Sequence, residues 1–148
     1  MIPLFKVYMS EKAKGEVGKV LDSGFIGQGP QVDKFEEELG KRFIKDRVVT
    51  VNSGTSAEHL AFRLLKNPRA SASPHESPWP GILDGDEALC TPLTCTATNF
   101  PVLANGINIK WVDVDKDTLN MDLTDLERKL SPKTKVIYVV HWEGIQSI

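Results

Sequence analysis

The run Ser53-Gly54-Thr55-Ser56 is the part of this sequence best suited to bind an anion. A β-branched segment ends just before it, and a strong helical pattern begins within a few residues. The first turn of a helix has free backbone N–H groups and the positive end of the helix dipole, and glycine lets a ligand approach the backbone closely. The hydroxyls of Thr55 and Ser56 add donors, so the run predicts a cup for a phosphate group. A simple N-cap is the commoner use of such residues, and the run is neither a Walker loop nor a dinucleotide fingerprint.

The other side chains that could do chemistry give weaker signals. His141 ends a predicted strand, where sites in α/β proteins usually form, although a structural histidine is the alternative. Cys90 and Cys95 have no further cysteine to join, so we expect two free thiols rather than a disulfide framework or a zinc site. Asp113 and Asp115 could bind a divalent cation, but no third ligand is evident. We therefore expect loop and cap residues there, and no metal site.

The composition excludes several classes of function. The chain has 148 residues, a formal net charge of −2 and 26% charged residues, so it has no basic excess to attract nucleic acid. No apolar run approaches the roughly 20 residues of a membrane-spanning helix. The apolar part of the N-terminus is too short for a secretory signal, so we expect a cytoplasmic protein that binds neither nucleic acid nor membrane.

Two helices and a glycine-rich loop are predicted before residue 47. The first helix follows Ser10 and ends near Gly24. The loop runs from Gly24 to Pro30 and contains Gly27, Gln28 and Gly29. The second helix carries its apolar residues near the 3.6-residue period.

Short strands alternate with helices in the rest of the chain. The predicted strands are Arg47–Val51, Glu87–Thr91, Asn108–Val112 and Lys135–Val140. This alternation predicts an α/β fold with a mostly parallel sheet that is flanked by helices.

The helices between these strands have recognisable ends. The clearest helical stripe begins at Ala57, and Asp122 is expected to cap a later helix. Between them, Thr94 to Asn105 is expected to turn into a helix that keeps Pro101 in its first turn. We divide the chain into N-terminal helices and loop (1–46) and an α/β layer (47–148). Within the layer, residues 67–83 are a Pro/Ser-rich insertion loop with Trp79 as its apolar anchor.

Short motifs follow one another in an order that is more specific than any one of them. In chain order they are Ile2-Pro3; Gly24 to Pro30 followed by Val32 and Phe35-Glu36; Ser53-Gly54-Thr55; Gly85-Asp86-Glu87; Thr94 with Ala97-Thr98; Asp113-Val114-Asp115 through Asn120-Met121-Asp122; and Thr134-Lys135 followed by His141-x-x-Gly144. This series resembles the DegT-type family of sugar-nucleotide aminotransferases, which depend on pyridoxal phosphate. The resemblance implies the N-terminal part of the type I pyridoxal-phosphate transferase large domain.

The resemblance also implies roles for individual residues. The backbone of Gly54, with Thr55 and Ser56, would hold the cofactor phosphate. Cys95 stands where the family usually places an aromatic ring against the pyridine face, so this chain departs from the pattern and offers less stacking area. His141 would lie near the substrate.

The Gly27, Gln28 and Gly29 loop would lie near the substrate or the partner subunit. Relatives of this kind are homodimers that use a sugar nucleotide and an amino donor in polysaccharide or deoxyaminosugar biosynthesis. The resemblance therefore also implies a homo-oligomer, with a dimer as the expected form.

The family's lysine that bonds to the cofactor, and the aspartate that pairs with its pyridine nitrogen, lie downstream of the His-x-x-Gly motif. No lysine follows Lys135 in this sequence, so we assign no catalytic residue. We expect a truncated chain that is inactive alone and cannot attach the cofactor covalently. Two alternatives remain: a non-catalytic α/β module that binds a phosphorylated ligand, and a structural piece that associates with other chains.

Overall fold

The structure is a computed structural model that describes residues 6–43, 47–70 and 77–144. Ile2-Pro3 of the motif series and residues 71–76 of the predicted insertion lie outside these ranges. The chain forms two compact units, Met1–Thr50 and Val51–Ile148, and each is described by itself.

The first unit contains the two predicted helices, α1 (Ala13–Asp22) and α2 (Pro30–Phe43). Gly24 adopts a φ of +71° just after α1, a conformation that glycine takes without strain, so it ends the helix as predicted. Glu36 of α2 accepts hydrogen bonds from the backbone N–H of Thr50 at 2.6 Å and from its hydroxyl at 2.8 Å. No side chain of α1 or α2, both of which lie within the described residues, is buried.

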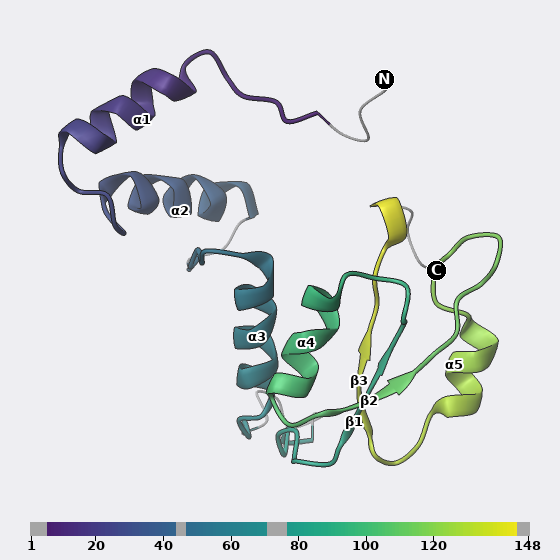
Figure 1. Cartoon of the computed structure of the whole chain (residues 1–148). Coiled ribbons are helices and arrows are strands. Elements are labelled where there is room, and N and C mark those ends of the chain that lie inside the picture. Colours follow the sequence, from purple (N-terminus) through teal and green to yellow (C-terminus); the bar gives the residue numbers. More distant parts are fainter. Residues whose placement is uncertain (1–5, 44–46, 71–76, 145–148) are drawn as a thin grey trace. The chain divides into compact units, whose positions relative to one another are not determined.

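The second unit contains a parallel sheet of β1 (Glu87–Cys90), β2 (Asn108–Trp111) and β3 (Thr134–Tyr138) (Figure 1). The order of the described strands is β2-β1-β3, which puts the most apolar strand in the centre. The helices of this unit are α3 (Gly54–Leu65), α4 (Thr96–Ala104) and α5 (Leu123–Lys129), and a 3₁₀ turn, η1 (Trp142–Gly144), follows β3. The predicted α/β fold and three of the predicted strands are confirmed.

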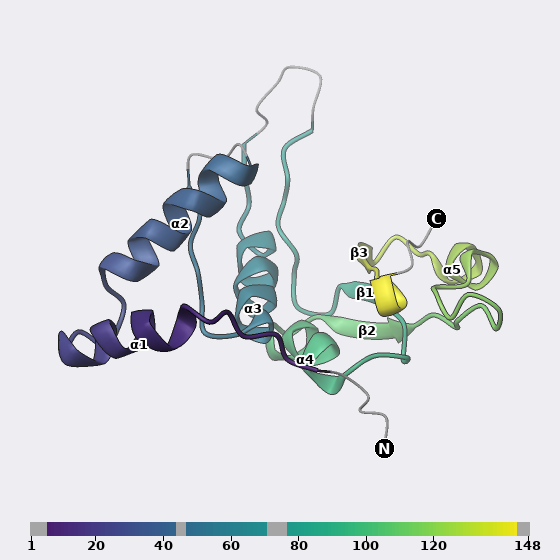
Figure 2. The ribbon, with the colours of Figure 1, turned by 90° about the horizontal axis from the view of Figure 1, so that it is seen from above.

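The sheet lies between two helical layers because successive side chains of a strand point to opposite faces. Ala88 and Cys90 of β1 pack with Phe62 of α3 and Val102 of α4. Between them, Leu89 points the other way, into a cluster of Val112, Met121 and Leu126, the last of which belongs to α5. Figure 2 shows the same arrangement from above, with α3 and α4 on one side of the sheet and α5 on the other.

The strand predicted at Arg47–Val51 is not formed. This segment has no ladder to any strand of the described residues, and Val49 is 77% exposed. A β-branched run favours extended backbone, but a strand also needs a hydrogen-bonding neighbour, which the local sequence cannot supply. β3 likewise ends at Tyr138, two residues before the predicted end.

The helix predicted after Thr94 begins too early to keep Pro101 in its first turn. α4 starts at Thr96, so Pro101 is its sixth residue and lies beyond the first turn, where we expected it. A proline there removes one helical hydrogen bond. Pro101 is fully buried, and the contacts it makes in the core offset that loss.

The described part of the proline-rich loop is fastened by Trp79. Its indole N–H donates to the carbonyl of Leu65 at 2.8 Å, and its ring packs against the core cluster of Phe62 and Ile82. Its backbone forms an antiparallel bridge with Arg69, so Trp79 anchors the loop as predicted.

Among the described residues, no helix is long and apolar enough to cross a membrane.

Candidate functional site

The N-terminus of α3 is closed first by its own cap. Ser53 has extended backbone (φ −160°, ψ 158°), and its Oγ accepts the N–H of Ser56 at 3.1 Å. The Ser53 hydroxyl donates to Ser56 Oγ at 3.0 Å, and the Ser56 hydroxyl donates to Asn52 Oδ1 at 2.8 Å. The N-cap that the sequence allowed is therefore present, and the hydroxyl proton of Ser56 is already used.

Donors remain at the same helix end. The backbone N–H groups of Gly54 and Thr55 have no acceptor among the described residues. A Cβ at Gly54 would meet nothing within 4 Å, so the backbone there is open to a ligand. Thr55 is half-buried in the first turn, so its hydroxyl can donate beside these N–H groups. The arrangement fits a phosphate group bound to Gly54 and Thr55 more directly than to Ser56.

This helix end lies at the carboxyl edge of the sheet. The opposite end of α3 is tied to the start of β1, because Leu65 accepts the N–H of Ile82 at 3.1 Å and Lys66 pairs with Asp84. Figure 1 shows the first turns of α3 and α4 and the turn η1 at the same end of the unit. Ligands of open parallel sheets bind at this edge.

Cys95 is the N-cap residue of α4 and is exposed, with extended backbone and no capping hydrogen bond from its side chain. Asn99 of the same helix donates to the carbonyl of Thr91 at 3.2 Å, which fixes α4 to the end of β1. Cys90 is buried, and burial raises the pKa of its thiol to about 12. The two free thiols therefore differ: Cys95 is exposed at the start of α4, whereas Cys90 belongs to the core.

His141 is exposed and lies between β3 and η1. Its carbonyl accepts the N–H of Gly144 at 3.1 Å, which closes the turn. The structure thus brings His141, Cys95 and the start of α3 to one edge of the second unit. Whether they bind a ligand there stays a prediction.

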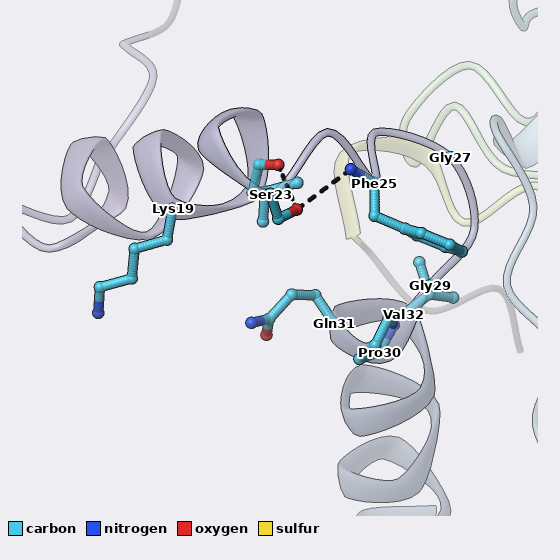
Figure 3. Close-up of a pocket in the computed structure, with 9 residues that line it drawn as sticks. Lys19, Ser23, Phe25, Gly27, Gly29, Pro30, Gln31 and Val32 are labelled. Atoms are coloured by element: carbon cyan, nitrogen blue, oxygen red, sulfur yellow. Dashed lines mark hydrogen bonds between the residues drawn. The ribbon is translucent and has the colours of Figure 1, made fainter.

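Gly27 and Gly29 lie in the first unit, where they line a pocket of about 380 Å³ (Figure 3). The pocket is mostly apolar, with Lys19 as its charged lining residue and the Gln31 amide beside it. Gln28 is not among the residues that line it. The turn is fixed by Ser23, whose hydroxyl donates to the Val20 carbonyl at 2.7 Å and accepts the N–H of Phe25 at 3.1 Å. The lining residues are Lys19, Val20, Ser23, Phe25, Gly27, Gly29, Pro30, Gln31 and Val32.

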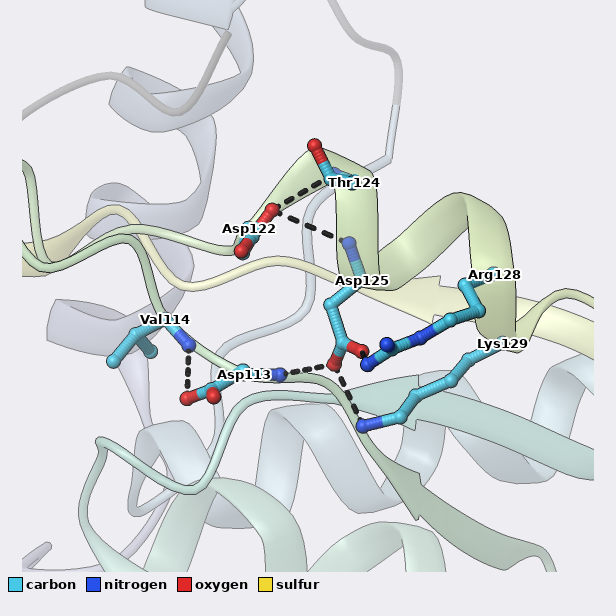
Figure 4. A network of polar contacts seen from close by, with 7 residues as sticks. All are labelled: Asp113, Val114, Asp122, Thr124, Asp125, Arg128 and Lys129. Carbon is cyan, nitrogen blue, oxygen red and sulfur yellow. Dashed lines mark hydrogen bonds and ion pairs between the residues drawn. The ribbon is translucent and has the colours of Figure 1, made fainter.

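Asp113 and Asp115 serve the loop after β2. The backbone N–H of Asp113 donates at 2.8 Å to Asp125 (Figure 4). Asp115 accepts the N–H of Thr118 at 2.8 Å. Asp122 caps α5 as predicted by accepting the N–H of Thr124 at 2.8 Å. Within the described ranges, no group of three or more His, Cys, Asp or Glu side chains could hold a metal ion.

Asp125 is a residue that the sequence analysis missed. Its buried carboxylate pairs with Lys129 at 2.6 Å and with Arg128, and it accepts the N–H of Asp113. The hydrogen bond from Lys129, followed by that from Asp113, holds the pKa of Asp125 well below its usual range. Basic residues three and four positions after an aspartate were the available signal.

A sequence model of the DegT/DnrJ/EryC1/StrS aminotransferase family matches residues 7–147. The chain belongs to this family. The fold agrees: the structure of the sugar aminotransferase CalS13 from Micromonospora echinospora superposes with a TM-score of 0.79 at 48% identity, over 99% of this chain and 36% of CalS13. The α/β unit therefore matches part of the sugar aminotransferase fold.

Two further comparisons concern the cofactor and the biosynthetic setting of similar proteins. Spr1654 from Streptococcus pneumoniae, solved in a PLP form, matches with a TM-score of 0.79 at 30% identity, over 99% of this chain and 33% of Spr1654. The spore coat polysaccharide biosynthesis protein SpsC of Bacillus subtilis (strain 168) is 33% identical over 87% of this chain and 29% of SpsC. Relatives therefore bind pyridoxal phosphate, and the chain spans about a third of the length of each.

Proposed function

We propose that this chain forms the cofactor-phosphate-binding part of a pyridoxal-phosphate-dependent aminotransferase that acts on keto-sugar nucleotides in polysaccharide or deoxyaminosugar biosynthesis. The observation that carries the proposal is the open first turn of α3, in a member of a family whose relatives bind this cofactor. When bound, pyridoxal phosphate supplies the electron-withdrawing ring and the carbonyl group that amino-group transfer requires.

The residues at the carboxyl edge suit different parts of such a cofactor. The N–H groups of Gly54 and Thr55 and the Thr55 hydroxyl bind the phosphate. Cys95 packs against one face of the ring with less area than an aromatic side chain would give. His141, exposed beyond β3, contacts the substrate. In the first unit, Gly27, Gln28 and Gly29 bind the sugar nucleotide or meet the partner subunit of a homodimer.

The 148-residue chain alone binds the cofactor without turning over. Transamination would need a lysine placed to bond with the cofactor, whereas Lys133 directly precedes β3 and Lys135 is its second residue, at the edge opposite to the α3 N-terminus. The proposed activity is therefore one that a longer polypeptide of this family performs, and this chain contributes binding and orientation.

Calorimetry with pyridoxamine phosphate tests the proposal, since this form has no aldehyde to react with surface lysines. Pyridoxamine without the phosphate should bind at least about tenfold more weakly, because hydrogen bonds to a charged group contribute roughly 1.5–3 kcal/mol each. Thr55→Val should weaken the phosphate form by about the same factor. Thr124→Val, the same change in the first turn of α5, is the matched control and should bind as wild type.

Two outcomes would count against the proposal. Equal affinity for pyridoxamine with and without phosphate would remove the phosphate site. Equal affinity for pyridoxamine phosphate and inorganic phosphate would favour the alternative, a non-catalytic module for phosphorylated ligands.

A further inference from the structure

Asn120 joins the loop after β2 to the turn after β3. Its side chain is buried, with the residue 5% exposed, and its Oδ1 accepts the backbone N–H of Trp142 at 3.2 Å. Trp142 is the first residue of η1 and directly follows His141. A buried amide that reaches across 22 residues to a backbone N–H fixes two loops relative to each other.

The backbone around Asn120 is itself held in place. Its carbonyl accepts the N–H of Asp115 at 2.8 Å, and its N–H donates to the Thr118 hydroxyl at 3.3 Å. Leu119, just before it, adopts a φ of +60°, which non-glycine residues rarely take. The amide therefore projects from a backbone whose direction several contacts determine.

The turn that receives this amide lies beyond the end of β3. β3 ends at Tyr138, so the ladder to β1 stops before His141. The bond from Gly144 N–H to the His141 carbonyl closes the turn on itself. The bond from the Trp142 N–H to Asn120 joins the turn to the loop after β2.

We propose that Asn120 is a positioning residue, which sets the direction of the His141 turn at the carboxyl edge. The inference rests on the proposed function, in which that edge receives a phosphorylated cofactor and an anionic sugar nucleotide. A neutral amide suits this place because it accepts the Trp142 N–H without adding negative charge beside anionic ligands. A carboxylate could accept the same bond but would repel those ligands.

Nuclear magnetic resonance of the ligand-free 148-residue chain tests the inference with three variants. Asn120→Ala removes the acceptor, whereas Asn120→Asp keeps it. Asn105→Ala is the matched control, because Asn105 is also buried, 6% exposed, and its amide donates to the Pro101 carbonyl at 2.8 Å. The readouts are the hydrogen-exchange rate of the Trp142 amide and the ring resonances of His141, assigned with His141→Gln.

Asn120→Ala should raise the exchange rate of the Trp142 amide about tenfold, as expected for one lost hydrogen bond, and should shift the His141 ring resonances. Asn120→Asp should restore both. Asn105→Ala should leave the Trp142 exchange rate and the His141 resonances at wild-type values, even if it lowers the melting temperature as much as Asn120→Ala does. If the alanine variant does not fold, Asn120→Ser, which is too short to reach Trp142, replaces it.

Three results would overturn the inference: unmoved His141 resonances in Asn120→Ala or Asn120→Ser, an equal shift in Asn105→Ala, or a folded Asn120→Asp that behaves like the alanine variant. The proposed function has a separate readout in the same samples, the shift of the Gly54 and Thr55 amides when pyridoxamine phosphate is added. Absence of that shift would refute the cofactor site and leave the ligand-free comparison intact.

Discussion

Phe62 should hold α3, and with it the proposed phosphate site, against the sheet. It is 4% exposed, and its ring meets Tyr138 of β3 edge to face, with ring centroids 5.2 Å apart at 88°. Removing a buried phenylalanine side chain costs about 3–5 kcal/mol, of which such an aromatic pair accounts for roughly 0.5–1.5 kcal/mol. In a domain of roughly 60–100 residues, the size of the second unit, each kcal/mol of lost stability lowers the melting temperature by about 4–8 °C. Phe62→Ala should therefore lower it by about 12 °C or more.

The matched control lies on the same helix. Leu64 is 63% exposed, so Leu64→Ala should change the free energy of unfolding by less than about 1 kcal/mol. Urea denaturation followed by circular dichroism gives the free energy of unfolding of both variants. In a background with Trp111 and Trp142 replaced by phenylalanine, the fluorescence of Trp79, which packs on the same core cluster, reports whether the core loosens first. Similar losses in the two variants would mean that α3 is not held by this core, and the account of how the site is positioned would fail.

Three further predictions concern charge, thiols and assembly. The pKa of Asp125 is lowered in the folded chain, mainly by Lys129, so the stabilising effect of its carboxylate is present above about pH 4 and is lost as the pH falls further. The urea midpoint of Asp125→Asn should therefore vary less with pH below about pH 4 than the urea midpoint of wild type. Parallel curves of urea midpoint against pH for the two proteins would contradict this. Iodoacetamide at neutral pH should modify the exposed Cys95 at least about tenfold faster than Cys90, because burial raises the pKa of the Cys90 thiol to about 12. Mass spectrometry measures both rates, and equal rates would place Cys90 outside the core. The exposed apolar side chains of α1 and α2 should make the chain self-associate, which light scattering at micromolar concentration measures, and a clean monomer would contradict it.

Features with a local cause could be predicted from the sequence. Ser53 and Asp122 were recognisable as helix starts because a cap and the helix it closes are neighbours in sequence. The central strand Glu87–Cys90 was recognisable because its residues after Glu87 form a short apolar run, as in a strand buried on both faces.

Features that depend on distant residues could not be predicted in the same way. Arg47–Val51 has the composition of a strand, but pairing depends on a neighbour elsewhere in the chain. Pro101 is tolerated in the middle of α4 because of the core around it, which the helical pattern does not show. At the candidate site, the open N–H groups followed from the motif, whereas the bond between Asn120 and Trp142 joins residues that no short pattern connects.

The central claim is that the first turn of α3 binds the phosphate of a pyridoxal-type cofactor, and mapping pyridoxamine phosphate onto the chain by amide chemical shifts tests it most directly. We expect saturable shifts that are largest at Gly54 and Thr55, together with a smaller shift at Cys95 that pyridoxamine without phosphate does not produce. Largest shifts at another helix N-terminus, or shifts scattered over surface lysines with none at Gly54 and Thr55, would contradict the claim.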